Sequence, residues 1–218
     1  MSRSSPAKRR LAVDQRRAEL LELGLELFAR VAYDALSIDA IARAAGISKG
    51  LLYHYFPSKR DYYVATVRVA AERLLEATAA ATADIGLAPT ELLFRGLDAY
   101  LDFVERHGEA YATLLRSGIG SDPEVVEIVE RTRGAFARQL RERLGLEDAP
   151  LTRLALRGWV GFVEVTSLDW RAGREIERPR LRRLLARALL GTLAAAELRS
   201  PAVVALVADA EDAALSQS

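Results

Sequence analysis

Apolar residues recur at three- and four-residue spacing along nearly the whole chain. This spacing is the pattern of amphipathic helices, whereas the strict alternation typical of strands is nearly absent. Glycine and proline interrupt the pattern at intervals that separate helices of ordinary length. The sequence therefore predicts an all-α fold.

The interruptions also predict where the longer helices begin and end. Asp122 can cap a helix whose first residue is Pro123, since proline suits the first helical position. Pro201 can begin a short tail helix. The longer helices are expected at about residues 59–82, 89–106, 123–144, 151–171 and 178–198, with a short one at about 109–116.

The segment SIDAIARAAGISKGLLYHYFPSK, residues 37–59, predicts two short helices joined by a turn. Ser37 can cap the first, Gly46 can take the left-handed conformation that ends it, and Ser48 can cap the second. Such a pair is a helix-turn-helix, which places its second helix in the major groove of DNA. The positions expected to face inward are Ile38, Ile41, Ala42, Ala45, Ile47, Leu52 and Phe56.

The outward side of the second helix carries residue types that suit DNA. Lysine and the hydroxyls of serine and tyrosine can bond phosphates or base edges, glycine permits close approach, and an outward leucine can touch a thymine methyl. Solvated positions on an amphipathic helix are the simpler interpretation of any one of them, but the set together favours DNA binding. The candidate residues are Ser37, Ser48, Lys49, Gly50, Leu51, Tyr53, His54 and Lys59.

At these residues the chain resembles the DNA-binding domain of the TetR (tetracycline repressor) family of bacterial transcription regulators. The resemblance covers roughly Arg17 to Thr66 and includes the run LELFARVAYDALSIDAIARAAGISKGLLYHYFPSK. It implies that Ser37 contacts a phosphate at the start of the second helix. It also implies that Lys49, Gly50 and Tyr53 meet DNA from the recognition helix and that Lys59 binds a phosphate from the fourth helix.

Three positions depart from the family pattern. Leu51 stands where threonine is frequent, and His54 lies between two tyrosines instead of directly before phenylalanine. Ala32 stands where the family usually has glycine at the end of the first helix. If that turn stays left-handed, alanine costs on the order of 1 kcal/mol; otherwise the helix ends differently.

Positive charge is concentrated at the N-terminal end. Residues 1–60 hold eleven Lys and Arg against six Asp and Glu, a balance of +5, whereas residues 61–218 hold 20 against 24, a balance of −4. A basic end of this kind suits phosphate neutralisation. Residues 1–13 are expected to be a mobile basic tail, either an arm along the DNA or a solubilising segment.

Several classes of protein lack support in the sequence. There is no cysteine, the two histidines are far apart, and no segment approaches the ~20 uncharged apolar residues of a membrane span. We therefore expect a soluble cytoplasmic protein without metal, cofactor or membrane partner. An all-α enzyme acting on a small apolar substrate is the least supported hypothesis, because no nucleophile or acid-base motif is present.

The two helices expected at 151–171 and 178–198 are apolar on more than one face, so each needs cover on several sides. The resemblance implies a four-helix interface between two copies, and a purely intramolecular core is the alternative. A two-fold dimer would present two recognition helices to a near-palindromic operator. The candidate interface residues are Leu154, Gly158, Leu181, Leu185, Ala188 and Thr192.

The middle helices carry aromatic and scattered polar residues, where the resemblance implies a pocket for a small-molecule effector. Aromatic residues at helical spacing are more often ordinary core. Glu164 either pairs with an arginine, which we favour, or awaits a polar or cationic ligand. The candidate ligand residues are Phe103, Tyr111, Phe136, Trp159, Phe162 and Glu164.

These observations predict four regions: a tail (1–13), a three-helix helix-turn-helix DNA-binding domain (14–60), a larger helical effector-binding and dimerisation domain (61–200), and a C-terminal tail (201–218). The leading functional hypothesis is a homodimeric repressor that an apolar or amphipathic effector releases from its operator. A regulator of the same fold controlled by a protein partner, or by nothing, is the alternative.

Overall fold

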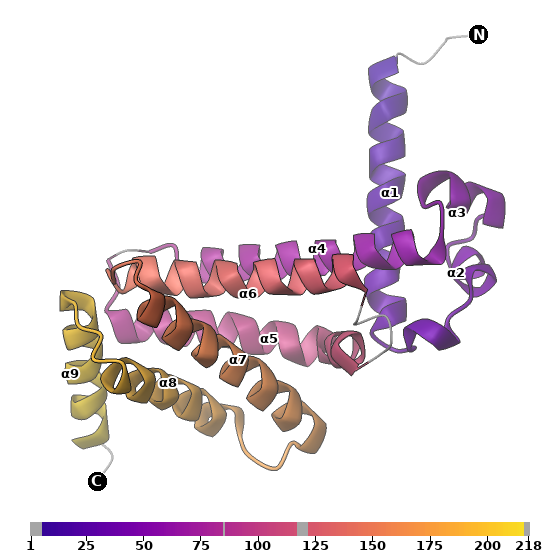
Figure 1. Ribbon diagram of the computed structural model, residues 1–218. Coiled ribbons are helices and arrows are strands. Elements are labelled where there is room, and N and C mark those ends of the chain that lie inside the picture. Colours follow the sequence, from indigo (N-terminus) through magenta and orange to yellow (C-terminus); the bar gives the residue numbers. More distant parts are fainter. Residues whose placement is uncertain (1–5, 85, 117–121, 216–218) are drawn as a thin grey trace. The chain divides into compact units, whose positions relative to one another are not determined.

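The computed structural model describes residues 6–84, 86–116 and 122–215, and over these ranges it is helical with no strand (Figure 1). The all-α prediction is confirmed. The helices are α1 (Pro6–Phe28), the 3₁₀ turn η1 (Tyr33–Ala35), α2 (Ile38–Ala44), α3 (Lys49–Tyr55), α4 (Lys59–Ala81), α5 (Pro89–Arg116), α6 (Pro123–Arg143), α7 (Pro150–Gly173), α8 (Arg178–Ala195) and α9 (Pro201–Leu215).

One predicted helix boundary is wrong. The sequence predicted a break near Arg106 and a separate short helix over 109–116, but α5 continues through Gly108 to Arg116. A single glycine inside a helix costs only about 1 kcal/mol relative to alanine, which a helix of this length can absorb. At the other end of the chain, α1 begins at Pro6, inside the segment expected to be mobile. The mobility of that segment stays a prediction.

The chain forms two compact units, and the first is discontinuous in sequence. The first unit comprises residues 1–72 and 109–128, and the second comprises 73–108 and 129–218. The borders fall inside α4, α5 and α6, so these helices each contribute residues to both units. The first unit contains the predicted helix-turn-helix.

An aromatic core holds the first unit together. Tyr62 is fully buried and its hydroxyl donates to the Leu20 carbonyl at 2.6 Å, which joins α4 to α1. Its ring meets the Phe56 ring edge-on at 4.9 Å, and Phe28 meets Tyr63 in the same way at 4.7 Å. Burial raises the pKa of Tyr62, so the phenol stays a donor at all physiological pH values.

The second unit is organised around the packing of α7 on α8. Four leucines at helical spacing along α8 are almost completely buried. The Trp159 indole of α7 donates its Nε1 hydrogen to the Leu185 carbonyl at 2.9 Å, which satisfies its one polar group in the interior. The four leucines are Leu181, Leu185, Leu189 and Leu193.

The close contact of α1 with α4 gives a stability prediction. A Cβ at Gly24 would lie 2.5 Å from Thr66 Oγ1 and 2.9 Å from the Tyr62 hydroxyl. Gly24→Ala should therefore lower the free energy of unfolding by about 1–3 kcal/mol, measured by urea denaturation. Gly134→Ala is the matched control, because nothing lies within 4 Å of its Cβ and alanine there should stabilise α6 by about 0.5–1 kcal/mol. Equal effects of the two substitutions would contradict the packing argument.

Candidate nucleic-acid interface

Local hydrogen bonds shape the turn between α2 and α3 as the sequence predicted. Ser37 Oγ accepts from the Ala40 amide at 3.1 Å, and Ser48 Oγ accepts from the Leu51 amide at 3.2 Å. Gly46 has φ +63°, in the left-handed region that favours glycine. The two caps and the glycine turn are confirmed, and α2 packs on α3.

The inward face of this pair is also largely as expected. Ile38, Ile41, Ala42, Leu52 and Phe56 are buried. Two further positions predicted to face inward are only partly covered, namely Ala45 and Ile47 at the turn. The buried set fixes the rotation of α3 about its axis and so decides which side chains point outward.

The outward side chains of α3 are exposed. Leu51 and Tyr53 each keep about 40% of their surface exposed, and the other residues predicted for this face are exposed as well. They are Ser48, Lys49, Gly50 and His54. The helix therefore presents a continuous surface of polar and small residues with one leucine.

Lys49 has a partner that the sequence did not reveal. Its Nζ donates to Asp39 Oδ2 of α2 at 3.0 Å, and this hydrogen bond raises the pKa of Lys49. The carboxylate lies ten residues away on a different helix, so helical spacing gave no signal for the pair. Asp39 thus holds the lysine at the first turn of the recognition helix.

Lys59 also contacts groups that the sequence did not predict. Its Nζ donates to the carbonyls of Tyr33 at 2.9 Å and Leu36 at 3.1 Å, and lies 4.1 Å from the centre of the Tyr33 ring. The lysine therefore satisfies the carbonyls at the 3₁₀ turn that precedes α2. An ammonium has three donors, so one remains for the phosphate expected there.

The backbone at Ala32 decides between the two alternatives for the end of the first helix. Ala32 has φ −57° and ψ 148°, so the left-handed turn of the family is not kept. Helix α1 ends at Phe28, and Ala32 instead precedes the 3₁₀ turn. Alanine is therefore unstrained at this position.

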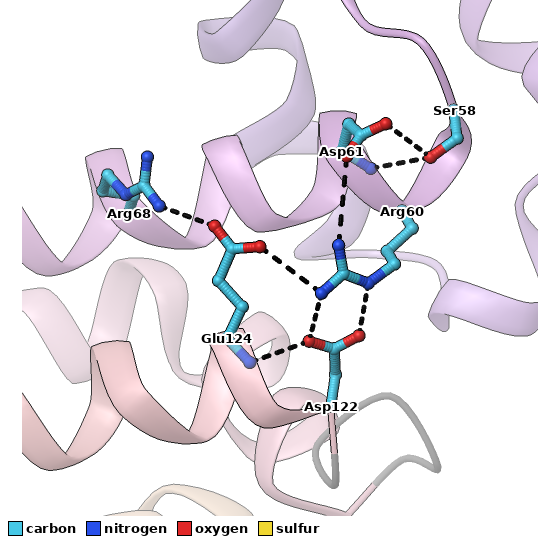
Figure 2. A network of polar contacts seen from close by, with 6 residues as sticks. All are labelled: Ser58, Arg60, Asp61, Arg68, Asp122 and Glu124. Carbon is cyan, nitrogen blue, oxygen red and sulfur yellow. Dashed lines mark hydrogen bonds and ion pairs between the residues drawn. The ribbon is translucent and has the colours of Figure 1, made fainter.

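Arg60 lies at the centre of an ion-pair network in the first unit (Figure 2). It donates to both carboxylate oxygens of Asp122, from Nε at 2.5 Å and from Nη2 at 2.7 Å. Its Nη2 also reaches Glu124, whose other oxygen accepts from Arg68 at 2.7 Å. The first turns of α4, which follow the recognition helix, are therefore bound to the first turn of α6.

Asp122 performs two tasks in this network. Its Oδ1 accepts from the Glu124 amide at 3.0 Å, as expected of a helix cap, and both of its oxygens bind Arg60. The hydrogen bond from Arg60 is the main reason that the pKa of Asp122 is lowered. Capping was predictable from the sequence, whereas the partner 62 residues away was not.

In the second unit, Glu164 is paired as the sequence analysis favoured. Only 3% of Glu164 is exposed, and its two oxygens accept from Arg133 Nε and Nη2, each at 2.7 Å. Arg133 Nη1 donates to Glu130 at 2.6 Å. The carboxylate therefore has a bidentate partner within the chain.

The aromatic residues predicted to line a ligand site lie in different surroundings. Phe103 and Trp159 are buried, and Phe136 is half-buried with its ring edge-on to Tyr100 at 6.4 Å. Phe162 is 41% exposed on the outer side of α7. Tyr111 lies outside the residues whose side chains the structure describes.

The predicted dimer residues also divide into two groups. Leu181 and Leu185 are fully buried within the second unit and cannot contact another copy in this conformation. Leu154 is 70% exposed, Gly158 is exposed, and Ala188 and Thr192 are half-buried. We call the exposed apolar side chains around them the outer stripe, which consists of Leu151, Leu154, Phe162 and Val165 of α7 and Leu184 of α8.

Known proteins match both parts of the chain. Residues 20–66 match the family described as bacterial regulatory proteins of the tetR family, and residues 89–192 match the tetracyclin repressor-like C-terminal domain. The transcriptional regulator BetI of Cronobacter sakazakii is 30% identical over 68% of this chain and 76% of its own length. The chain belongs to the TetR family. It is therefore a transcriptional regulator with a helix-turn-helix DNA-binding domain, and DNA is its expected partner.

A solved structure and a further relative agree with TetR-family membership. The crystal structure of a tetR-family transcriptional regulator from Streptomyces coelicolor has a TM-score of 0.77 and 32% identity, covering 84% of this chain and 82% of that one. The transcriptional activator FasR of Mycolicibacterium smegmatis is 31% identical over 56% of this chain. The match spans about half of FasR, 55% of its length.

The described part of this TetR-family chain contains neither a helix that could span a membrane nor a cluster of residues that could hold a metal ion. None of its described helices combines the length and apolar character needed to cross a membrane. No group of three or more histidine, aspartate or glutamate side chains in the described ranges is arranged to hold a metal ion.

The lowered pKa of Asp122 predicts a pH dependence of stability. Asp122→Asn keeps a cap but removes the charge, so it should lower the urea midpoint at pH 7. The pKa of Asp122 in the folded state lies below its ordinary value of 3.8. The loss of stability caused by Asp122→Asn should therefore be complete above pH 3.8 and become smaller as the pH falls below 3.8.

Urea titrations between pH 3 and 7 measure this effect, and Arg60→Gln provides the control. In the Arg60→Gln background, Asp122→Asn should cost much less at pH 7, because the partner of the carboxylate is already gone. A deficit that is independent of both pH and Arg60 would contradict the ion-pair interpretation.

Proposed function

We propose that the chain is a homodimeric repressor that binds a near-palindromic operator and leaves it when a small apolar or amphipathic effector binds the second unit. The observation that carries the DNA-binding part is the exposed polar face of α3, held in a fixed orientation by its buried side. The remaining parts rest on the outer stripe and on the interior of the second unit.

The proposed reading face divides its contacts between bases and phosphates. Lys49 and Tyr53 reach base edges or phosphates, Gly50 lets the backbone approach, and Leu51 offers an apolar contact to a thymine methyl. Further polar residues, at the ends of α2 and α3 and at the start of α4, contact phosphates or neighbouring bases. These residues are Ser37, Ser48, His54 and Lys59.

The outer stripe supports the homodimer. Leu154, Phe162 and Val165 are large apolar side chains that a monomer would leave in water. Gly158 lies between them and permits a close approach of helices. A stripe that meets its own copy about a two-fold axis would bury both sets and present two recognition helices to two half-sites.

A repressor requires only occupancy of its operator, which the reading face and the dimer would supply. An activator would need a further surface for the transcription machinery. The relatives differ by name, since FasR is called an activator, whereas KstR2 of Mycobacterium tuberculosis is called a repressor and is 47% identical over 49 residues. We favour repression because it needs the fewest additional contacts.

Effector response requires a ligand with different affinities for two conformations of the chain. The network of Arg60 with Asp122 and Glu124 provides a mechanical link, because the first turn of α6 is bound to the helix that follows the recognition helix. A ligand that alters the position of α6 would therefore act on α4. The interior of the second unit is the proposed binding site.

The operator for this test is the DNA sequence that the wild-type protein selects from a random pool. Lys49→Ala should weaken binding to this operator by at least tenfold, because a lysine that contacts DNA contributes both charge and hydrogen bonds. Fluorescence anisotropy measures the affinity. A plot of the logarithm of the binding constant against the logarithm of the salt concentration should have a shallower slope for the variant than for the wild type.

Arg95→Ala is the matched control for Lys49→Ala, since it removes a half-exposed positive charge from the second unit. It should leave operator affinity and salt slope unchanged. Native affinity in Lys49→Ala, with helicity and oligomeric state intact, would rule out the assigned reading face.

Leu154→Glu should convert a dimer into a monomer at micromolar concentration, because it places a charge at the most exposed side chain of the outer stripe. Analytical ultracentrifugation gives the mass. Val204→Glu, at a position that is 62% exposed on α9, is the control and should remain dimeric. A wild-type protein that sediments as a monomer would remove the proposed dimer.

A further inference from the structure

Two hydroxyl groups in the interior of the second unit have no hydrogen-bond partner among the described residues. They are the Tyr100 hydroxyl of α5 and Ser167 Oγ of α7. Tyr100 is 9% exposed and Ser167 is 0% exposed, so the surrounding protein covers both. Buried hydroxyls are normally paired, and leaving one unpaired costs stability.

Both hydroxyls belong to residues placed next to the ion pair of Glu164 with Arg133, in which the carboxylate is buried and the guanidinium is partly exposed. Ser167 follows Glu164 by three residues on α7, which places it one helical turn away on the same side. Tyr100 meets Phe136 edge-on at 6.4 Å, and Phe136 follows Arg133 by three residues on α6. Burial is the main cause that raises the pKa of Tyr100; the charge of Glu164 raises this pKa further and the charge of Arg133 lowers it.

The ion pair itself is already satisfied. Arg133 binds both oxygens of Glu164 at 2.7 Å and donates its remaining nitrogen to Glu130 at 2.6 Å. Glu130 also pairs with Arg157. The two arginines and the two glutamates therefore neutralise one another within the chain.

This compensation disfavours a charged ligand. A ligand carboxylate would have to displace Glu164 or Glu130 from Arg133, and a ligand cation would have to compete with Arg133 for Glu164. Displacing Glu164 leaves a buried carboxylate without its partner, which is strongly unfavourable, and displacing Arg133 or Glu130 breaks an ion pair of a partly exposed group. A neutral hydroxyl or carbonyl can bond the two unpaired hydroxyls and leave the ion pair in place.

We propose that Tyr100 and Ser167 bind the polar end of an uncharged ligand, an alcohol or a ketone with an apolar body. The inference rests on the proposed function, since it names the chemical class of the effector. The apolar body lies against buried aromatic side chains, for which Phe103, one turn from Tyr100, and Trp159 are available. The indole N–H of Trp159 is already bonded to Leu185, so its ring contributes only apolar surface.

Three probes with the same ten-carbon chain test the ligand class on the full-length protein. They are 1-decanol, used below its solubility limit, and decanoate and decyltrimethylammonium, each used below the concentration at which it forms micelles. Binding is followed by the fluorescence of Trp159 and Trp170, the two tryptophans of the chain, and by calorimetry. Decanol should bind saturably and at least tenfold more tightly than either charged probe.

Tyr100→Phe and Ser167→Ala test the two hydroxyls. Each should weaken decanol binding about three- to tenfold, the equivalent of one neutral hydrogen bond. Without ligand, their unfolding midpoints should be unchanged or raised, because each variant removes a hydroxyl that has no partner. Tyr63→Phe, at a buried tyrosine of the first unit, is the control and should leave decanol affinity unchanged.

Three results would overturn the inference: no saturable binding of decanol, charged probes that bind as tightly as decanol, or unchanged decanol affinity in both variants. Operator release by a charged probe alone would support effector-controlled regulation and also overturn the inference. If decanol binds through Tyr100 and Ser167 but leaves operator affinity unchanged, the inference about the site holds and the proposed release mechanism fails.

Discussion

The burial of Tyr62 at the start of α4 is the constraint on which the first unit depends. Its ring packs against Phe56, the residue that ends the recognition helix, and its hydroxyl holds the Leu20 carbonyl of α1. The glycine at position 24 lets α1 approach this tyrosine closely. The orientation of α3 is therefore fixed by buried contacts on the side opposite its exposed face, while on that face Ser48 caps the helix and Lys49 pairs with Asp39.

In the second unit, α7 and α8 each have a buried and an exposed apolar side, and the sequence alone does not show which apolar residues belong to which side. Leu181 and Leu185 pack inward, whereas Leu184 and the α7 residues of the outer stripe are exposed on the surface of the second unit. The interior between these helices and α5 and α6 contains a charge-neutral ion pair and two hydroxyls. One helix, α7, thus contributes to the proposed dimer surface on one side and to the proposed ligand site on the other.

Local signals in the sequence predicted local structure well. The caps at Ser37, Ser48 and Asp122 and the turn at Gly46 depend on neighbouring residues only, and all four are confirmed. The partners that Lys59 and Arg60 bind on other elements lie 23 to 64 residues away, so no periodicity could reveal them. Nor could the pattern of α8 decide which of its leucines face inward, because both sides of that helix are apolar.

The discontinuity of the first unit has a consequence for how the DNA-binding domain could be separated or exchanged. Asp122 and Glu124 belong to that unit although about fifty residues of chain separate them from residue 72. A fragment that stops at residue 72 would keep every proposed DNA contact yet lose the carboxylates that bind Arg60 and Arg68. A chimaeric regulator that joins this DNA-binding domain to the effector-binding domain of another protein would therefore also need to include the start of α6.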